Sequence, residues 1–85
     1  MKVSYTKGFI KRFNKYEEGF QEIITEKIDE FKHIENHKQL RVHKLHGKFS
    51  DYFSFSVNHK MRIVFEYISK SEVALLSIGD HDIYD

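Results

Sequence analysis

The spacing of apolar residues in the first 35 positions predicts one short strand and two helices. Lys2 to Tyr5 reads as the opening strand. A first helix with a break at 14–16 and a second helix of roughly 15 residues follow, because apolar residues recur at i, i+3 and i+4. These residues are Phe9, Ile10, Phe13 and Tyr16 in the first helix, and Phe20, Ile23, Ile24, Ile28 and Phe31 in the second, opposite an acidic face of Glu22, Glu26, Asp29 and Glu30.

The second half of the chain changes to a period of two, which predicts strands. Tyr52 to Val57 alternates strictly, with Phe53, Phe55 and Val57 on one face. A hairpin turn at 58–60 leads into a strand at 61–68, with Ile63, Phe65 and Tyr67 on one side. Residues 73–78 are nearly all apolar, as is typical of a central strand. Residues 41–45 predict one further strand.

This order of elements predicts an α+β fold. An N-terminal strand and two helices pack on a mainly antiparallel sheet of four to five strands, because consecutive hairpins make neighbouring strands antiparallel. The chain has 85 residues, a length that fits one domain over residues 1–85. It contains no cysteine, so it has no disulfide framework and no thiolate metal site.

The charges are arranged in blocks, although the net charge is only +1. Residues 2–15 and 38–62 are basic, and residues 17–35 are acidic. A basic block on one face of a domain attracts phosphate groups, although such charges can also be a solvated surface. The sequence has no segment long and apolar enough to span a membrane and no apolar signal-peptide core, so we expect a cytoplasmic protein.

Three motifs in the second half resemble the toxins of the RelE/ParE superfamily. They are the segment Leu45-His46-Gly47-Lys48, the aromatic strand Tyr52 to Val57 followed by Met61-Arg62-Ile63-Val64-Phe65, and the ending Ile78-Gly79-Asp80-His81-Asp82-Ile83-Tyr84-Asp85. The ending is similar to that of YafQ- and HigB-like members. The resemblance implies the toxin of a type II toxin–antitoxin pair, with a cognate antitoxin as partner. It also implies cleavage of mRNA in the ribosomal A site, without a cofactor.

Two alternatives remain open at this point. ParE-like members share the fold and inhibit DNA gyrase by binding, and an inactive member would keep the fold without toxicity. The histidine near the C-terminus favours the nuclease, because the gyrase inhibitors typically lack it. Neighbouring genes would also discriminate, since a toxin of this kind is expected beside a small antitoxin gene.

Metal-independent RNA cleavage needs a base, an acid and a cation for the phosphate. Histidine suits the first two roles at neutral pH, and arginine donates two parallel hydrogen bonds to phosphate. The resemblance implies His81 as acid or base and Arg62 as the phosphate clamp, the alternative for Arg62 being a structural ion pair with Glu66. His43 lies where YafQ-like toxins have a catalytic histidine, and Tyr84 is a candidate for proton transfer or base stacking.

Several further cations are candidates for contacts with the RNA backbone. The predicted RNA-binding residues are Lys44, His46, Lys48 and Lys60, while Lys11, Arg12 and Lys15 either extend this footprint or form a solvated helix face. His46 could also replace His43. His33 and His37 are spaced i, i+4, but no further ligand motif accompanies them, so we predict no metal site.

Overall fold

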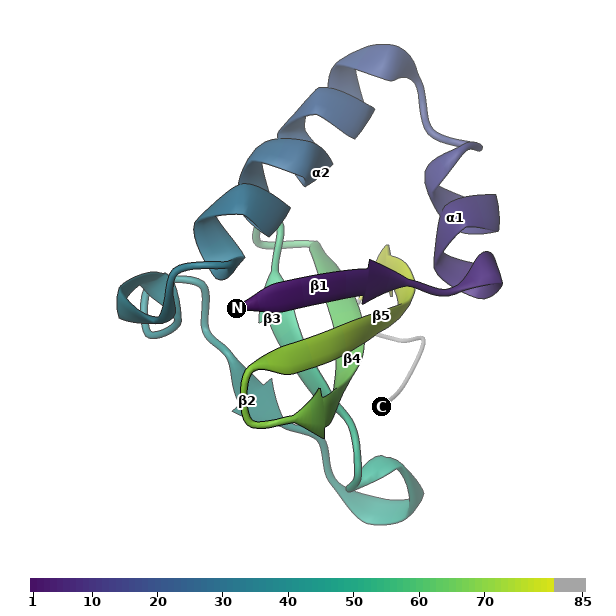
Figure 1. The fold of residues 1–85 in the computed structure, drawn as a ribbon. Helices are drawn as coiled ribbons and strands as arrows, with labels where there is room; N and C mark the ends of the chain where they lie inside the picture. Colours follow the sequence, from purple (N-terminus) through teal and green to yellow (C-terminus); the bar gives the residue numbers. More distant parts are fainter. Residues whose placement is uncertain (81–85) are drawn as a thin grey trace.

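The computed structural model describes residues 1–80, and they form a single mixed sheet with two helices (Figure 1). The elements are β1 (Lys2–Tyr5), α1 (Lys7–Phe13), α2 (Glu18–Phe31), β2 (His43–Lys44), β3 (Phe53–Ser56), β4 (Met61–Ser69) and β5 (Glu72–Asp80). The short 3-10 helices η1 (Ile34–Asn36) and η2 (Gly47–Phe49) lie on either side of β2. The strand order is β1-β5-β4-β3-β2. The predicted α+β fold is therefore confirmed.

The sheet is antiparallel except at β1, which runs parallel to β5. Thr6 joins the first strand to the first helix. Its hydroxyl accepts a hydrogen bond from the Phe9 amide at 3.2 Å and donates one to the Leu75 carbonyl at 2.8 Å. The cap thus satisfies one of the open amides of α1 and ties that helix to the central strand β5.

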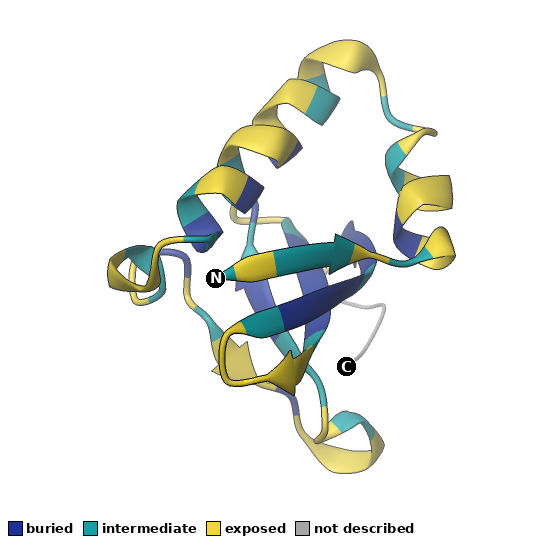
Figure 2. Cartoon of the chain, viewed as in Figure 1, coloured by how far each residue is buried: buried dark blue, intermediate teal, exposed yellow. Residues whose placement is uncertain are grey.

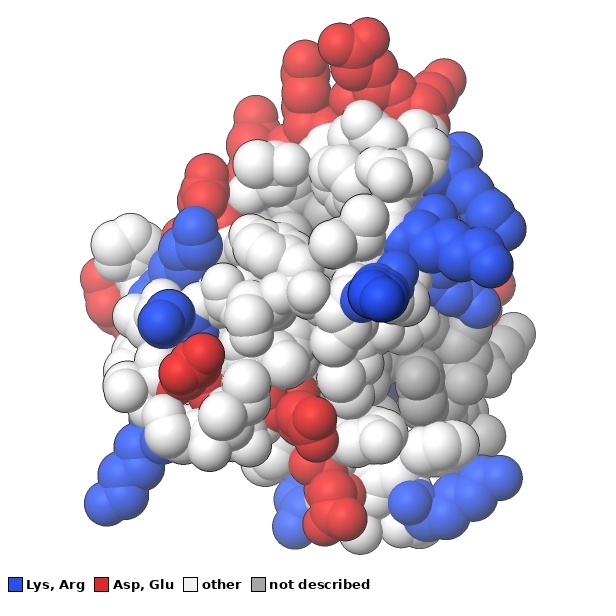
Figure 3. Space-filling view, turned by 45° about the vertical axis from the view of Figure 1, so that its right-hand side comes forward, with Lys and Arg blue, Asp and Glu red and all other residues white. Residues whose placement is uncertain are grey.

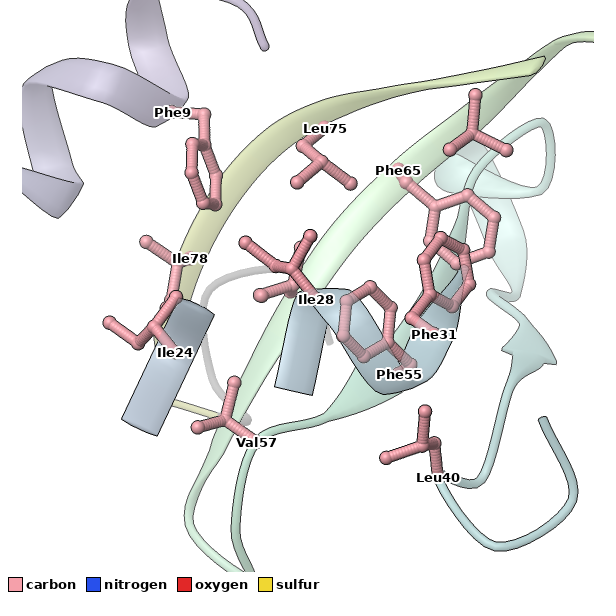
Figure 4. Close-up of a cluster of buried hydrophobic side chains, with 12 residues drawn as sticks. Phe9, Ile24, Ile28, Phe31, Leu40, Phe55, Val57, Phe65, Leu75 and Ile78 are labelled. Carbon is pink, nitrogen blue, oxygen red and sulfur yellow. The ribbon is translucent and has the colours of Figure 1, made fainter. Parts of the chain in front are cut away.

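The hydrophobic core fills the space between the two helices and one face of the sheet (Figure 4). Phe31 of α2 occupies the centre of an aromatic cluster. Its ring stacks on Phe55 with the centroids 4.2 Å apart and also contacts Phe65 at 4.8 Å and His37 at 4.7 Å. Figure 2 shows that burial is concentrated in the central strands and on the inner sides of the helices. Both helices therefore cover the same face, as the sequence predicted.

Two local expectations differ from the structure. The strand predicted at 41–45 is only two residues long, because Arg41 has a φ of 59° and this left-handed conformation cannot continue an extended strand. The apolar periodicity predicts Ile23 in the buried stripe of α2, but its side chain is exposed. Tyr67 lies on the same side of β4 as Phe65, as expected, since its ring contacts the rings of Phe65 and Phe53.

Candidate functional site

The face of the sheet opposite the helices carries two rows of polar side chains. His43 of β2 pairs with Ser54, which pairs with Val64, which in turn pairs with Ser77. In the second row, Ser56 pairs with Arg62, and Arg62 pairs with Gly79. Directly opposed residues of a sheet point to the same face, with Cβ atoms roughly 5 Å apart. We call the side chains of His43, Ser54, Ser56, Arg62 and Ser77 the polar face.

The polar face is built into the sheet rather than lying at its margin. Within residues 1–80, the buried polar or charged side chains are Ser54, Arg62 and Ser77, which are 0%, 5% and 7% exposed. All three side chains belong to the polar face. Their neighbours in sequence are core residues that point toward the helices, and successive residues of a strand point to opposite faces. Burying a guanidinium is costly unless it is matched by polar groups or a bound anion. Arg62 makes an interaction of this kind within the protein, and its place in the sheet puts a cation on the polar face.

A purely structural ion pair between Arg62 and Glu66 is the competing explanation for the arginine. Among the described residues, ion pairs join Lys27 to Glu30, Lys32 to Asp29 and His33 to Glu35. None of them includes Glu66. Arg62 does have an interaction partner within the protein, so a structural role remains the alternative explanation for its burial.

His43 is an exposed side chain whose proton position is set by its backbone partner. Its Nδ1 lies 2.8 Å from the Arg41 carbonyl oxygen, which can only accept a hydrogen bond, so Nδ1 carries the proton. Nε2 is then the acceptor nitrogen, 3.5 Å from the Ser54 hydroxyl, at the outer limit of a hydrogen bond. In this tautomer the imidazole presents a basic nitrogen toward the polar face.

A hollow of about 300 Å³ lies beside this histidine. It is lined by Gln39, Arg41, His43, Ser56, Asn58 and His59. Sequence patterns do not single out Arg41 or His59, because each lies in a turn whose partner in space is distant in the sequence. The serines of β3 are the sequence feature that indicates a polar face of the sheet. They alternate with Phe53 and Phe55, which places small polar groups on the face away from the core.

The predicted RNA-binding residues are not gathered at one place. Lys44 pairs with Phe53, so strand alternation directs it to the opposite side from His43. His46 and Lys48 are exposed, the first at the start of η2 and the second within it. Lys60 lies in the hairpin turn beside the hollow, where its amide donates to Asn58 Oδ1. The predicted catalytic residues His81 and Tyr84 lie outside the described residues. The last described residue, Asp80, pairs with Met61, next to Arg62.

Charge is distributed unequally between the two helices (Figure 3). Acidic side chains line the outer side of α2, among them Glu18, Glu22 and Glu26. Lys and Arg side chains gather over α1, where Arg12 also donates to the Ile78 carbonyl at 3.2 Å. An acidic ridge repels nucleic acid. The polar face and its hollow are on the side of the sheet away from that ridge.

Residues 1–80 contain no group of three or more side chains arranged to hold a metal ion. His37, one of the two histidines weighed as ligands, stacks on Phe31, and its Nε2 lies 2.7 Å from the Phe31 carbonyl oxygen. Neither helix of the described part is long and apolar enough to cross a bilayer.

Solved structures with the same fold include toxins and toxin–antitoxin complexes. The RelBE2 toxin–antitoxin complex of Mycobacterium tuberculosis aligns with a TM-score of 0.73 and 15% identity, over 94% of this chain and 96% of that chain. The YoeB–YefM complex of Staphylococcus aureus aligns with a TM-score of 0.71 and 14% identity, over 95% and 97% of the two chains. The YoeB/ParE toxin of Agrobacterium tumefaciens aligns with a TM-score of 0.68 and 19% identity, over 95% and 99%.

The similarity is one of structure, since these sequences are less than 20% identical to this chain. No family model matches the sequence, and no curated protein matches it either. The structural match nevertheless extends over nearly the full length of both partners in each case. The chain therefore has the same fold as these toxins.

Proposed function

We propose that this chain is the toxin of a type II toxin–antitoxin system and that it cleaves mRNA in the ribosomal A site, in the cytoplasm. The observation that carries the proposal is the position of Arg62. It is a buried guanidinium in the polar face, in register with Ser56, on the same side of the sheet as the basic nitrogen of His43. A cation and a base on one face of the sheet are two of the groups that cleavage of a phosphodiester requires.

The proposed reaction is an attack of the ribose 2′-oxygen on the adjacent phosphorus. His43 Nε2 takes the proton of the 2′-hydroxyl, and the new O2′–P bond forms as the P–O5′ bond breaks. Arg62 donates hydrogen bonds to the phosphate oxygens, where charge gathers in the transition state. The leaving 5′-oxygen receives a proton from an acid, for which the sequence offers His81. The products are a 2′,3′-cyclic phosphate and a 5′-hydroxyl.

Cleavage on translating ribosomes tests the proposal. Purified protein is incubated with ribosomes translating a defined message, and the RNA 5′ ends are mapped. We expect cuts at codons positioned in the A site. Intact messages, together with inhibition of DNA supercoiling by purified gyrase, would assign the chain to the gyrase inhibitors instead.

Replacing His43 with asparagine should lower the cleavage rate by about 10²- to 10⁴-fold, the usual contribution of a general base. Asparagine still offers an N–H group toward the Arg41 carbonyl but has no basic nitrogen. His33→Asn is the matched control, because His33 is an exposed histidine that precedes η1 and does not line the hollow. Single-turnover rates measure both variants. Equal losses in the two would remove His43 from the catalytic role.

An antitoxin partner should cover both the basic surface and an apolar groove between α1 and α2. The groove has a volume of about 400 Å³, and its lining includes Phe9, Phe13 and the 45% exposed side chains of Tyr5 and Ile10. Several of the structural neighbours are toxin–antitoxin complexes. An acidic antitoxin with an apolar segment fits these two surfaces, because ordering on a groove is typical of disordered partners.

The variant Ile10→Glu should weaken antitoxin binding by roughly 30-fold or more, since a buried apolar anchor typically contributes about 2 kcal/mol. We expect the antitoxin to be the product of a neighbouring reading frame, and titration calorimetry measures its affinity. Ile34→Glu is the control, because Ile34 is an exposed apolar residue of η1 that does not line the groove. Identical affinities for wild type and Ile10→Glu would exclude the groove as the docking site.

A further inference from the structure

The hollow beside His43 is formed by two turns. One turn leads into β2 and contributes Gln39 and Arg41, and the other is the β3–β4 hairpin, which contributes Asn58 and His59. None of the six lining residues carries a carboxylate. The hollow therefore combines a guanidinium and two imidazoles with two amides and a hydroxyl, a set of side chains suited to an anion with a polar body.

Backbone hydrogen bonds hold both walls in place. In the first turn the Arg41 amide donates to the Lys38 carbonyl, and the Val42 amide donates to the His37 carbonyl. The first turn is fastened to the sheet by the Ser56 amide, which donates to the Leu40 carbonyl at 2.8 Å. In the hairpin, Asn58 Oδ1 accepts from the amides of both Lys60 and Met61. A site held in this way loses little entropy when a ligand binds.

Arg41 has an unfavourable backbone conformation at this point. Its φ of 59° is the left-handed region, which costs a residue with a side chain about 1 kcal/mol or more. The same residue directs its carbonyl to His43 Nδ1 and its side chain lines the hollow. Glycine would suit this φ better. The turn thus holds a guanidinium at the hollow at a cost in backbone conformation.

We infer that the hollow is a binding subsite for one nucleotide of single-stranded RNA, next to the phosphate that is cut. Arg41 and His59 hold its phosphate, and the amides of Gln39 and Asn58 contact the edge of its base. Because Asn58 Oδ1 is engaged in the turn, Asn58 offers its NH₂ group as a donor. A volume of about 300 Å³ lies at the lower end of the range for small-ligand sites.

The location of the hollow gives the subsite its place in the reaction. His43 lines both the hollow and the polar face, and Ser56 of the lining is paired with Arg62. A nucleotide in the hollow therefore has its neighbouring phosphate at Arg62. The placing of the bound nucleotide next to the cut phosphate rests on the proposed ribonuclease function. Binding of a nucleotide to the hollow can still be measured without cleavage.

A titration followed by two-dimensional ¹H–¹⁵N NMR tests binding directly. The probes are cytidine 3′-monophosphate and inorganic phosphate. We expect the nucleotide to shift the backbone signals of Arg41 and His59 and the side-chain amide signals of Gln39 and Asn58. Inorganic phosphate should shift the first pair only. Nucleotide-induced shifts confined to residues outside the hollow would overturn the inference.

The matched variants are Arg41→Gly and Lys38→Ala. Glycine removes the guanidinium and also relieves the backbone, so the melting temperature should hold or rise while nucleotide affinity falls by about 10-fold. Lys38→Ala removes one positive charge from the same turn but not from the lining, and it should leave the affinity close to wild type. Equal affinities of Arg41→Gly and wild type would contradict the subsite.

Kinetics separate a failure of the subsite from a failure of the proposed function. In the cleavage assay, Arg41→Gly should raise KM more than it lowers kcat, and it should change the preference for the base beside the cut. If the wild type cleaves mRNA and Arg41→Gly cleaves it with the same KM and the same base preference, the subsite alone is rejected. A wild type that binds the nucleotide in the hollow but cuts no message would reject the nuclease alone.

Discussion

Substituting lysine for Arg62 should lower mRNA cleavage by about 10²- to 10³-fold, the usual loss when a preorganised donor to the transition state is removed. Lysine keeps the positive charge but cannot donate the two parallel hydrogen bonds with which arginine binds a phosphate. Arg62 is only 5% exposed, between Ser56 and Gly79 of the neighbouring strands. Its place in the sheet therefore fixes the geometry of those bonds. Single-turnover cleavage on ribosomes measures the effect.

Two controls show that the loss comes from the polar face. Lys27→Gln removes a positive charge from α2, on the other side of the sheet, and cleavage should remain near the wild-type rate. Thermal unfolding of Arg62→Lys should reveal whether the fold has been weakened. A folded Arg62→Lys variant with wild-type cleavage would show that the guanidinium does not bind the reacting phosphate.

The largest effect on stability should come from replacing Phe31 with alanine, at about 3–5 kcal/mol. Phe31 is fully buried and stacks on Phe55 with the ring centroids 4.2 Å apart. It also contacts Phe65 of the central sheet and His37 of the following loop. Removing the ring leaves a cavity where α2 meets the sheet. In a domain of this size the melting temperature should fall by at least ~12 °C.

Ile23→Ala is the matched control for this prediction, because Ile23 lies on the same helix with its side chain exposed. Surface substitutions typically change stability by about 0.5 kcal/mol or less. Urea unfolding of both variants gives the two free energies. Similar values for Phe31→Ala and Ile23→Ala would mean that the aromatic cluster does not anchor α2.

The secondary structure could be predicted well where one periodicity extends over many residues. The acidic and apolar faces of 18–31 specify an amphipathic helix, and the alternation at 52–57 specifies a strand with one buried face. The length of strand β2 was overestimated, because nothing in the sequence around Arg41 indicates its left-handed backbone. The parallel pairing of β1 with β5 depends on residues about 70 positions apart, a separation over which periodicity carries no information.

The candidate site was only partly predictable for a related reason. Arg62 and His43 could be selected because a family resemblance pointed to them, and the structure places them on one face. Arg41 and His59 line the hollow only because Ser56 hydrogen-bonds to Leu40 and brings two turns together. Lys44 illustrates the converse. It is adjacent to His43 in sequence, but strand alternation directs it to the other side.

The most direct test of the central claim is the chemistry of the RNA ends after cleavage on translating ribosomes. If His43 and Arg62 promote attack by the 2′-oxygen, every upstream fragment should end in a 2′,3′-cyclic phosphate and every downstream fragment should begin with a 5′-hydroxyl. The double variant His43→Asn, Arg62→Lys should produce neither. Fragments with 3′-hydroxyl and 5′-phosphate ends, or equal cleavage by the double variant, would contradict the account.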